Sequence, residues 1–193
     1  MGITAGHMKL AFDQLDRSMK ELGKEVNAER LGEIVQQHAF ASALSGAGAA
    51  TLPGAGALIA TGAAGASVLT MYVRISNALG VTFEDGALRA LASGVVADLS
   101  ATVITNVALA AAISFIPGFG QAGAAVLSMI GNFALVYIAA YIFIKMLSNL
   151  LMACRDVSNL SGDELKNYAN SIVSETDMKD IFKEAKKQYK ENK

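Results

Sequence analysis

The residues of this chain that could perform chemistry are few, and they do not form a catalytic or metal-binding pattern. Cys154 is the single cysteine of the 193 residues, so it has no partner for a disulfide or a thiolate metal site, and we interpret it as a small buried apolar residue. His38 has no second His or Cys four residues away, and we interpret it as a histidine on the apolar face of a helix. Glu84 and Asp85 are adjacent, so on a helix they would point about 100° apart. That geometry suits a helix N-terminus capped by Thr82 better than acid–base catalysis.

Two glycine-rich segments share one pattern, an aliphatic residue followed by Pro-Gly-x-Gly. The first contains Pro53, Gly54 and Gly56, and the second contains Pro117, Gly118, Phe119 and Gly120. Glycine-rich loops can hold phosphate, but here no Lys-Ser or Lys-Thr follows and no strand is expected before either segment. Proline lacks the N–H that a helix interior needs, and glycine tolerates positive φ. We therefore predict a break between helices at each segment.

The composition limits the possible functions further. No nucleophile is paired with a base, and no cluster of metal-ligating residues is present, so we expect no enzyme and no cofactor. The formal net charge is −1 and the isoelectric point is near 6.1, which gives no broad basic surface for a nucleic acid. Hydrophobic residues make up 53% and the mean hydropathy is +0.40, so we expect part of the apolar surface to meet lipid or a partner.

The charged residues lie mainly at the two ends of the chain, and residues 99–144 contain none. We predict two long apolar helices in this stretch, over 99–116 and 121–144, that fold back on each other at the turn formed by 117–120. Each helix is close to the ~20 residues that cross a ~30 Å hydrocarbon layer. A central apolar helical hairpin is therefore the main element of the predicted all-α bundle.

The other segments are expected to surround this hairpin. Residues 1–8 resemble a cloning remnant, and no secretory signal follows them. Residues 9–38 are expected to form two amphipathic helices, the first over 10–26 and the second capped by Asn27. Residues 39–153 form the apolar core, and residues 154–193 form two further amphipathic helices, the first opened by a capping box at Ser161 and Glu164. The last 15 residues hold six lysines and three acids, which indicates either a solvated helix end or contact with anionic lipid.

Polar side chains beside the apolar core lead to a further set of predictions. Asp98 lies at the edge of the hairpin, where an ionisable group is normally paired, so we predict a buried charge pair with Arg74 or Arg89 that fixes helix register. A polar lining for an ion path is the alternative interpretation.

The second arm of the hairpin carries two features that suit a membrane helix. A row of small residues is expected to pack against a neighbouring helix, and it consists of Gly120, Ala124 and Ser128. The far end carries two aromatic residues and a cation typical of a membrane interface, namely Tyr137, Tyr141 and Lys145. The same three residues could instead belong to a buried helix of a soluble bundle.

Three motifs in the central segment resemble those of a known family. They are Leu52-Pro53-Gly54, Met71-Tyr72-Val73-Arg74-Ile75 leading to Leu79-Gly80-Val81, and Ile116-Pro117-Gly118-Phe119-Gly120. Over about Ala39 to Leu147 the chain resembles the YcjF-like family, a bacterial hydrophobic domain often fused behind small Ras-like GTPase domains. The resemblance implies an all-α membrane module without activity of its own that works with a nucleotide-dependent partner. The acidic residue that the family carries after its first Pro-Gly is absent here, and the 193 residues contain no GTPase domain.

We therefore expect a non-enzymatic membrane-associated or membrane-inserting helical module of six to eight helices, which oligomerises or works with a GTPase partner. One alternative is a pore-forming effector that keeps the hairpin buried in a soluble bundle until it inserts. Another is a soluble helical domain that binds a protein partner or an apolar ligand. An even number of crossings and a Lys-rich C-terminus would place both termini in the cytoplasm of a bacterial inner membrane.

Overall fold

The computed structural model describes residues 6–49, 56–113 and 120–192, with side chains described outside 46–63 and 101–125. Over these residues the chain is an all-α bundle, as the sequence predicts. Its helices are α1 (His7–Glu21), α2 (Ala28–Ala49), α3 (Gly56–Leu79), α4 (Ala87–Ile113), α5 (Gly120–Met152), the 3₁₀ helix η1 (Val157–Asn159), α6 (Gly162–Glu175) and α7 (Met178–Glu191).

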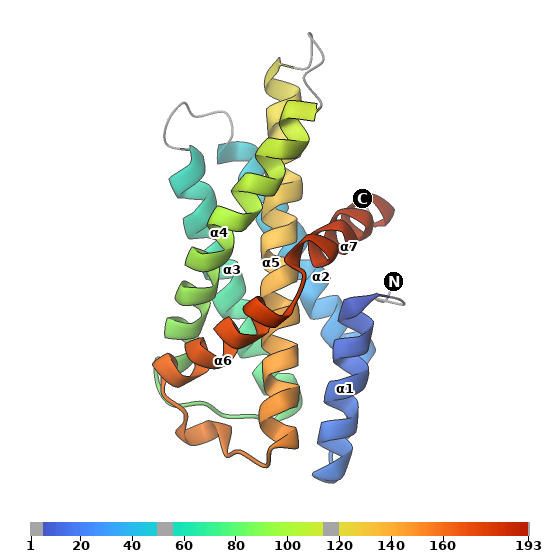
Figure 1. Ribbon diagram of the computed structural model, residues 1–193, viewed down its shortest axis with the longest axis vertical. Coiled ribbons are helices and arrows are strands. Elements are labelled where there is room, and N and C mark those ends of the chain that lie inside the picture. Colours follow the sequence, from blue (N-terminus) through green and yellow to red (C-terminus); the bar gives the residue numbers. More distant parts are fainter. Residues whose placement is uncertain (1–5, 50–55, 114–119, 193) are drawn as a thin grey trace.

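Helix α5 is the central element of the bundle and contacts all six other α-helices. Figure 1 shows α2, α3, α4 and α5 running up and down along the long axis of the molecule. Helix α1 lies along the lower half of α5, and α6 and α7 cross it obliquely. The predicted arms of the hairpin correspond to α4 and α5. Helix α4 begins before the charge-free stretch 99–144, and α5 ends after it.

The amphipathic helices form because their apolar residues recur at spacings of three and four. Met8, Phe12, Leu15 and Met19 form the buried face of α1. Two of the predicted caps are confirmed. The Asn27 Oδ1 accepts the backbone N–H of Arg30 at 2.9 Å, and Ser161 and Glu164 form a capping box before α6.

The first helix is shorter at its end than the periodicity predicts. It stops at Glu21, not near Val26, because Gly23 adopts a positive φ of 70° and the Lys24 N–H returns to the Met19 carbonyl at 3.0 Å. At its beginning it includes His7 and Met8, which the sequence assigns to a cloning remnant, and the Met8 side chain is fully buried.

The helix predicted to begin beside Thr82 begins later. Helix α4 begins at Ala87, and Glu84 and Asp85 lie in the exposed turn before it, so they do not open the helix. Gly86 has a φ of 83°, a left-handed conformation that interrupts a right-handed helix at this point. Helix α3 ends at Leu79, directly before Gly80, which has a φ of 61°.

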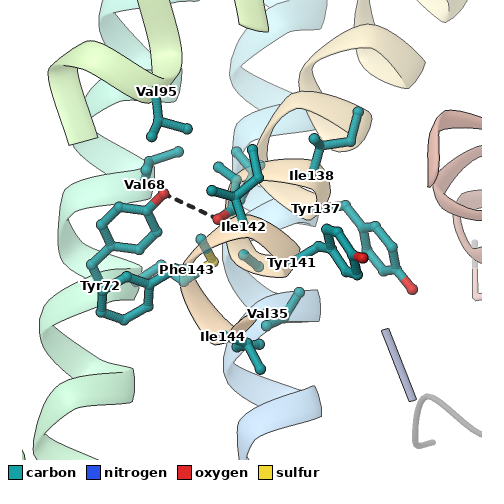
Figure 2. Close-up of a cluster of buried hydrophobic side chains, with 14 of the residues drawn as sticks. Val35, Val68, Tyr72, Val95, Tyr137, Ile138, Tyr141, Ile142, Phe143 and Ile144 are labelled. Atoms are coloured by element: carbon teal, nitrogen blue, oxygen red, sulfur yellow. Dashed lines mark hydrogen bonds between the residues drawn. The ribbon is translucent and has the colours of Figure 1, made fainter. Parts of the chain in front are cut away.

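The core is packed around the middle of α5, where every residue from Ile130 to Ile144 is buried. Tyr72 of α3 stacks on Phe143 with ring centroids 4.1 Å apart, and its hydroxyl donates to the Ala139 carbonyl at 3.0 Å (Figure 2). A second group of rings, which we call the aromatic cluster, joins α2, α5 and α7. It consists of Phe40, Phe133, Tyr137 and Tyr189.

Candidate functional site

The four long helices bring the charge-free parts of the sequence to one end of the bundle. Helix α2 ends and α3 begins there, and α4 ends and α5 begins there (Figure 1). We call the parts of these helices beyond the aromatic cluster the charge-free end; they are residues 41–49, 56–66, 100–113 and 120–132. No Asp, Glu, Lys or Arg occurs in any of these ranges. The opposite end of the bundle is surrounded by the charged outer faces of α1 and α6.

Large apolar side chains are exposed on the part of the charge-free end whose side chains are described. Leu44 on α2 is 67% exposed and Val126 on α5 is 43% exposed. Both lie beyond the aromatic cluster, on helices without a charge in that region. Large apolar side chains are also exposed outside the charge-free end, at Leu10, Leu22, Val73 and Met152. The feature that distinguishes the charge-free end is therefore the absence of charge from its four helix segments.

Among the described residues, one segment is long and apolar enough to cross a membrane, and it is Val126–Met152 of α5. Its most apolar window is 83% buried inside the protein. Length and composition alone therefore agree both with a membrane helix and with the core helix of a soluble bundle.

A polar cluster lies between α2 and α3, just below the charge-free end. The Arg74 guanidinium donates to His38 Nε2 at 3.1 Å and to Gln37 Oε1 at 3.0 Å. Ser67 Oγ lies 3.4 Å from His38 Nδ1 and donates to the His38 carbonyl at 3.0 Å. Burial, with the nearby positive charge of Arg74, holds the pKa of His38 below its usual value of 6.5. The imidazole is therefore neutral at pH 7 and accepts a hydrogen bond from the arginine.

This cluster predicts a pH dependence of stability. The His38 pKa is lower in the folded protein than in the unfolded chain, so the unfolded chain binds a proton more readily than the folded protein. Lowering the pH below about 6.5 therefore favours unfolding. We expect the free energy of unfolding of the wild type to fall over this range. His38→Gln keeps an acceptor for Arg74 but does not titrate, so part of the decrease should disappear. Urea unfolding at a series of pH values measures the free energy of unfolding of both proteins. An identical pH dependence in the wild type and in His38→Gln would contradict a role for His38.

A second polar cluster joins three helices around the Glu184 carboxylate of α7, whose side chain is 11% exposed. The carboxylate accepts the backbone N–H groups of His7 and Met8 at 2.6 and 3.1 Å, so it caps the N-terminus of α1. It also accepts the Tyr137 hydroxyl of α5 at 2.8 Å. Glu184 therefore ties α1 and α7 to the central helix.

Glu184→Gln is expected to destabilise the fold by about 1.5–3 kcal/mol, the usual contribution of hydrogen bonds to a charged group. The amide keeps the shape of the side chain but brings an N–H group toward donors and removes the negative charge from the helix N-terminus. Urea unfolding measures the change, and hydrogen exchange should show the loss of protection mainly in α1. Glu175→Gln, on the exposed end of α6, is the matched control. An unchanged midpoint for Glu184→Gln would contradict the proposed link.

No protein-family model, curated protein or solved structure matches the chain. The resemblance to the YcjF-like family and the GTPase partner that it implies therefore stay predictions from the sequence motifs.

The predicted buried charge pair is wrong. Arg74, Arg89 and Asp98 are all exposed, and in the part of the chain that the structure describes no ion pair joins Asp98 to either arginine. Arg74 is engaged instead with His38 and Gln37 on α2. All three side chains are exposed, so their charges do not need to be paired inside the core.

The residues predicted for a membrane interface lie elsewhere in this packed form. Tyr137 and Tyr141 are buried under the surrounding helices, and Lys145 is partly buried on the same helix. In Figure 2 the two tyrosines project from α5 within the bundle. They are not on an outer surface because α1, α2 and α7 cover this part of α5.

Several predicted residues fall outside the described part of the structure. These are Pro53 and Gly54 of the first break, Pro117, Gly118 and Phe119 of the hairpin turn, and the side chain of Ala124 in the small-residue row. Gly56 and Gly120 are the first residues of α3 and α5, so a helix begins where each Pro-Gly-x-Gly segment ends. Ser128 is partly buried on α5.

The remaining chemical candidates do not assemble into a site. Cys154 is exposed and not buried as expected, because it follows α5 in a turn with a φ of 50°. No group of three metal-ligating side chains occurs among the described residues. Two surface hollows, of about 330 and 410 Å³, lie beside Arg74 and beside Arg89. The charge-free end, which the sequence predicted only as a hairpin, is therefore the main candidate site.

Proposed function

We propose that this protein docks end-on to a membrane, with the charge-free end in the hydrocarbon layer and the charged half in water. The supporting observation is that four consecutive helices gather their charge-free parts at one end, while the charged faces of α1 and α6 lie around the other. Helix ends without charge can enter hydrocarbon at low cost, whereas an exposed charge there would cost about 2.5–3.5 kcal/mol at the centre of a bilayer.

The dimensions of the charge-free end set the depth of insertion. Helix α5 rises about 20 Å from Phe133 to Gly120, and α4 rises about 21 Å from Leu99 to Ile113, at ~1.5 Å per residue. This is more than one leaflet of a ~30 Å hydrocarbon layer but less than a full crossing. In this packed form we therefore propose insertion from one side, with α4 and α5 reaching deepest because their connected ends extend beyond those of α2 and α3 (Figure 1).

A liposome-binding experiment tests this function. The full chain, purified without detergent, is mixed with vesicles that contain anionic lipid and floated on a density gradient. We expect the protein to rise with the vesicles and to stay bound after a high-salt wash, because apolar burial does not depend on ionic strength. Protein that stays at the bottom of the gradient would contradict the proposal and favour a soluble domain that binds a protein or an apolar ligand.

A second function is favoured by the burial of α5. Its apolar window is 83% covered by protein, which is the arrangement expected of a pore former that keeps its hydrophobic hairpin inside a soluble bundle. Release of α4 and α5 across a bilayer would then require α1 and α7 to detach. Vesicles loaded with a self-quenching dye separate the two functions: leakage on binding supports the pore former, whereas binding without leakage supports end-on docking.

A further inference from the structure

The outer face of α7 carries a row of lysines on the side opposite its buried residues. The row consists of Lys183, Lys186, Lys187 and Lys190, at spacings of three and four residues, so its members share one side of the helix. Together with Glu191 they line an open hollow of about 380 Å³. Anionic groups small enough to enter such a hollow could contact several ammonium groups at once.

In the part of the chain that the structure describes, two of these cations have no acidic partner of their own. Lys183 pairs with Asp180 at 2.7 Å and Lys187 lies 3.8 Å from Glu191. Lys186 and Lys190 form no ion pair within the described residues. Of the nearby acids on α7, Glu184 is turned inward to α1 and Tyr137 and so is withdrawn from the outer face, whereas Glu191 lines the hollow beside the lysines.

The contacts of α7 place its C-terminal half next to the charge-free end. Tyr189 packs on Phe133 with ring centroids 5.4 Å apart, whereas Glu184 binds Tyr137, one turn further from the charge-free end. Residues later in α7 therefore lie closer to that end, and Figure 1 shows the helix rising toward it. The lysine row therefore lies beside the boundary between the charge-free end and the rest of the bundle.

We propose that the lysine row of α7 binds the anionic headgroups of the membrane that the charge-free end enters. This rests on the proposed docking function and adds the class of lipid that the protein selects. Cations at the boundary between an apolar surface and water are positioned to meet lipid phosphates, and each adds about 1 kcal/mol of attraction to an anionic surface before salt screens it. The apolar end supplies affinity for any bilayer, and the lysines supply the preference for negatively charged ones.

The test compares vesicles of phosphatidylcholine alone with vesicles of equal parts phosphatidylcholine and phosphatidylglycerol, in dilute buffer. The variant Lys186→Gln/Lys190→Gln removes the two unpaired cations. Lys20→Gln/Lys24→Gln gives the same change in net charge far from α7. It removes Lys20, which pairs with Asp16 in the last turn of α1, and Lys24, in the loop that follows. We expect the first variant to bind anionic vesicles about 25-fold more weakly than the wild type, from a factor of about five per cation. Its binding to neutral vesicles should be unchanged, and the control variant should retain the wild-type preference.

The outcomes separate this inference from the proposed function. Equal binding of the wild type to both kinds of vesicle, or an equal loss in both double variants, would overturn the lysine row as the headgroup site while leaving end-on docking intact. Failure of the wild type to bind either vesicle would overturn both. Circular dichroism of the two variants should match the wild type, because all four lysines are at least partly exposed.

Discussion

Leu44→Asp and Val126→Asp are each expected to lower the binding constant for vesicles at least tenfold, and the double variant to abolish measurable binding. Both side chains are exposed at the charge-free end, on α2 and α5 respectively. An aspartate there costs about 2.5–3.5 kcal/mol at the centre of a bilayer and less near its surface, while 1.4 kcal/mol already equals a factor of ten. In water the same substitutions should change stability by less than about 0.5 kcal/mol.

The matched control is Leu10→Asp, which places the same charge at a position 64% exposed on α1, in the charged half of the molecule. Quantitative flotation of all variants with anionic vesicles measures the effect. Wild-type binding by Leu44→Asp/Val126→Asp would show that the charge-free end does not enter lipid. An equal loss with Leu10→Asp would point to overall charge as the cause.

Phe133→Ala is expected to lower the free energy of unfolding by about 3–5 kcal/mol, the usual loss for a large aromatic residue removed from a packed core. The ring is fully buried, with its centroid 4.9 Å from that of Phe40 on α2 and 5.4 Å from that of Tyr189 on α7. Truncation therefore leaves a cavity between three helices and removes their aromatic contacts.

Urea unfolding in the absence of detergent measures this prediction. Leu22→Ala, at the exposed end of α1, removes apolar volume where no cavity forms and should be close to neutral. A loss below about 1 kcal/mol in Phe133→Ala would show that α2 and α7 do not pack against α5 in water, since truncating a fully buried aromatic residue lowers the free energy of unfolding by more than this. Such a result would favour lipid as the normal environment of this helix.

The helices and their ends could largely be predicted because they depend on residues close in the sequence. The buried face of α1, the cap at Asn27, the capping box at Ser161 and the end of α3 before Gly80 all follow from spacings of a few residues. The errors are also local. Gly23 and Gly86 adopt left-handed conformations, which end α1 early and delay α4.

The environment of α5 could not be predicted, because an uninterrupted apolar sequence suits lipid and a protein core equally well. In this structure α1 and α7, which are separate from α5 in the sequence, cover part of it. Glu184 binds Tyr137 across 47 residues, and Arg74 binds His38 across 36. The residue pattern of a single helix carries no information about partners on other helices. Tyr137 was therefore predicted at a membrane surface and Arg74 in a buried charge pair.

The most direct test of end-on docking measures where the charge-free end lies when the protein is bound to a vesicle. Val126→Cys and Leu22→Cys, each in a Cys154→Ser background, carry an environment-sensitive fluorophore on a position exposed at one end or the other of the molecule. Quenchers attached to lipid acyl chains report contact with hydrocarbon, and aqueous iodide reports contact with water. We expect the label at position 126 to be quenched by the acyl-chain probe and shielded from iodide, with the reverse at position 22. A label at position 126 that stays fully accessible to iodide on vesicle-bound protein would contradict end-on docking.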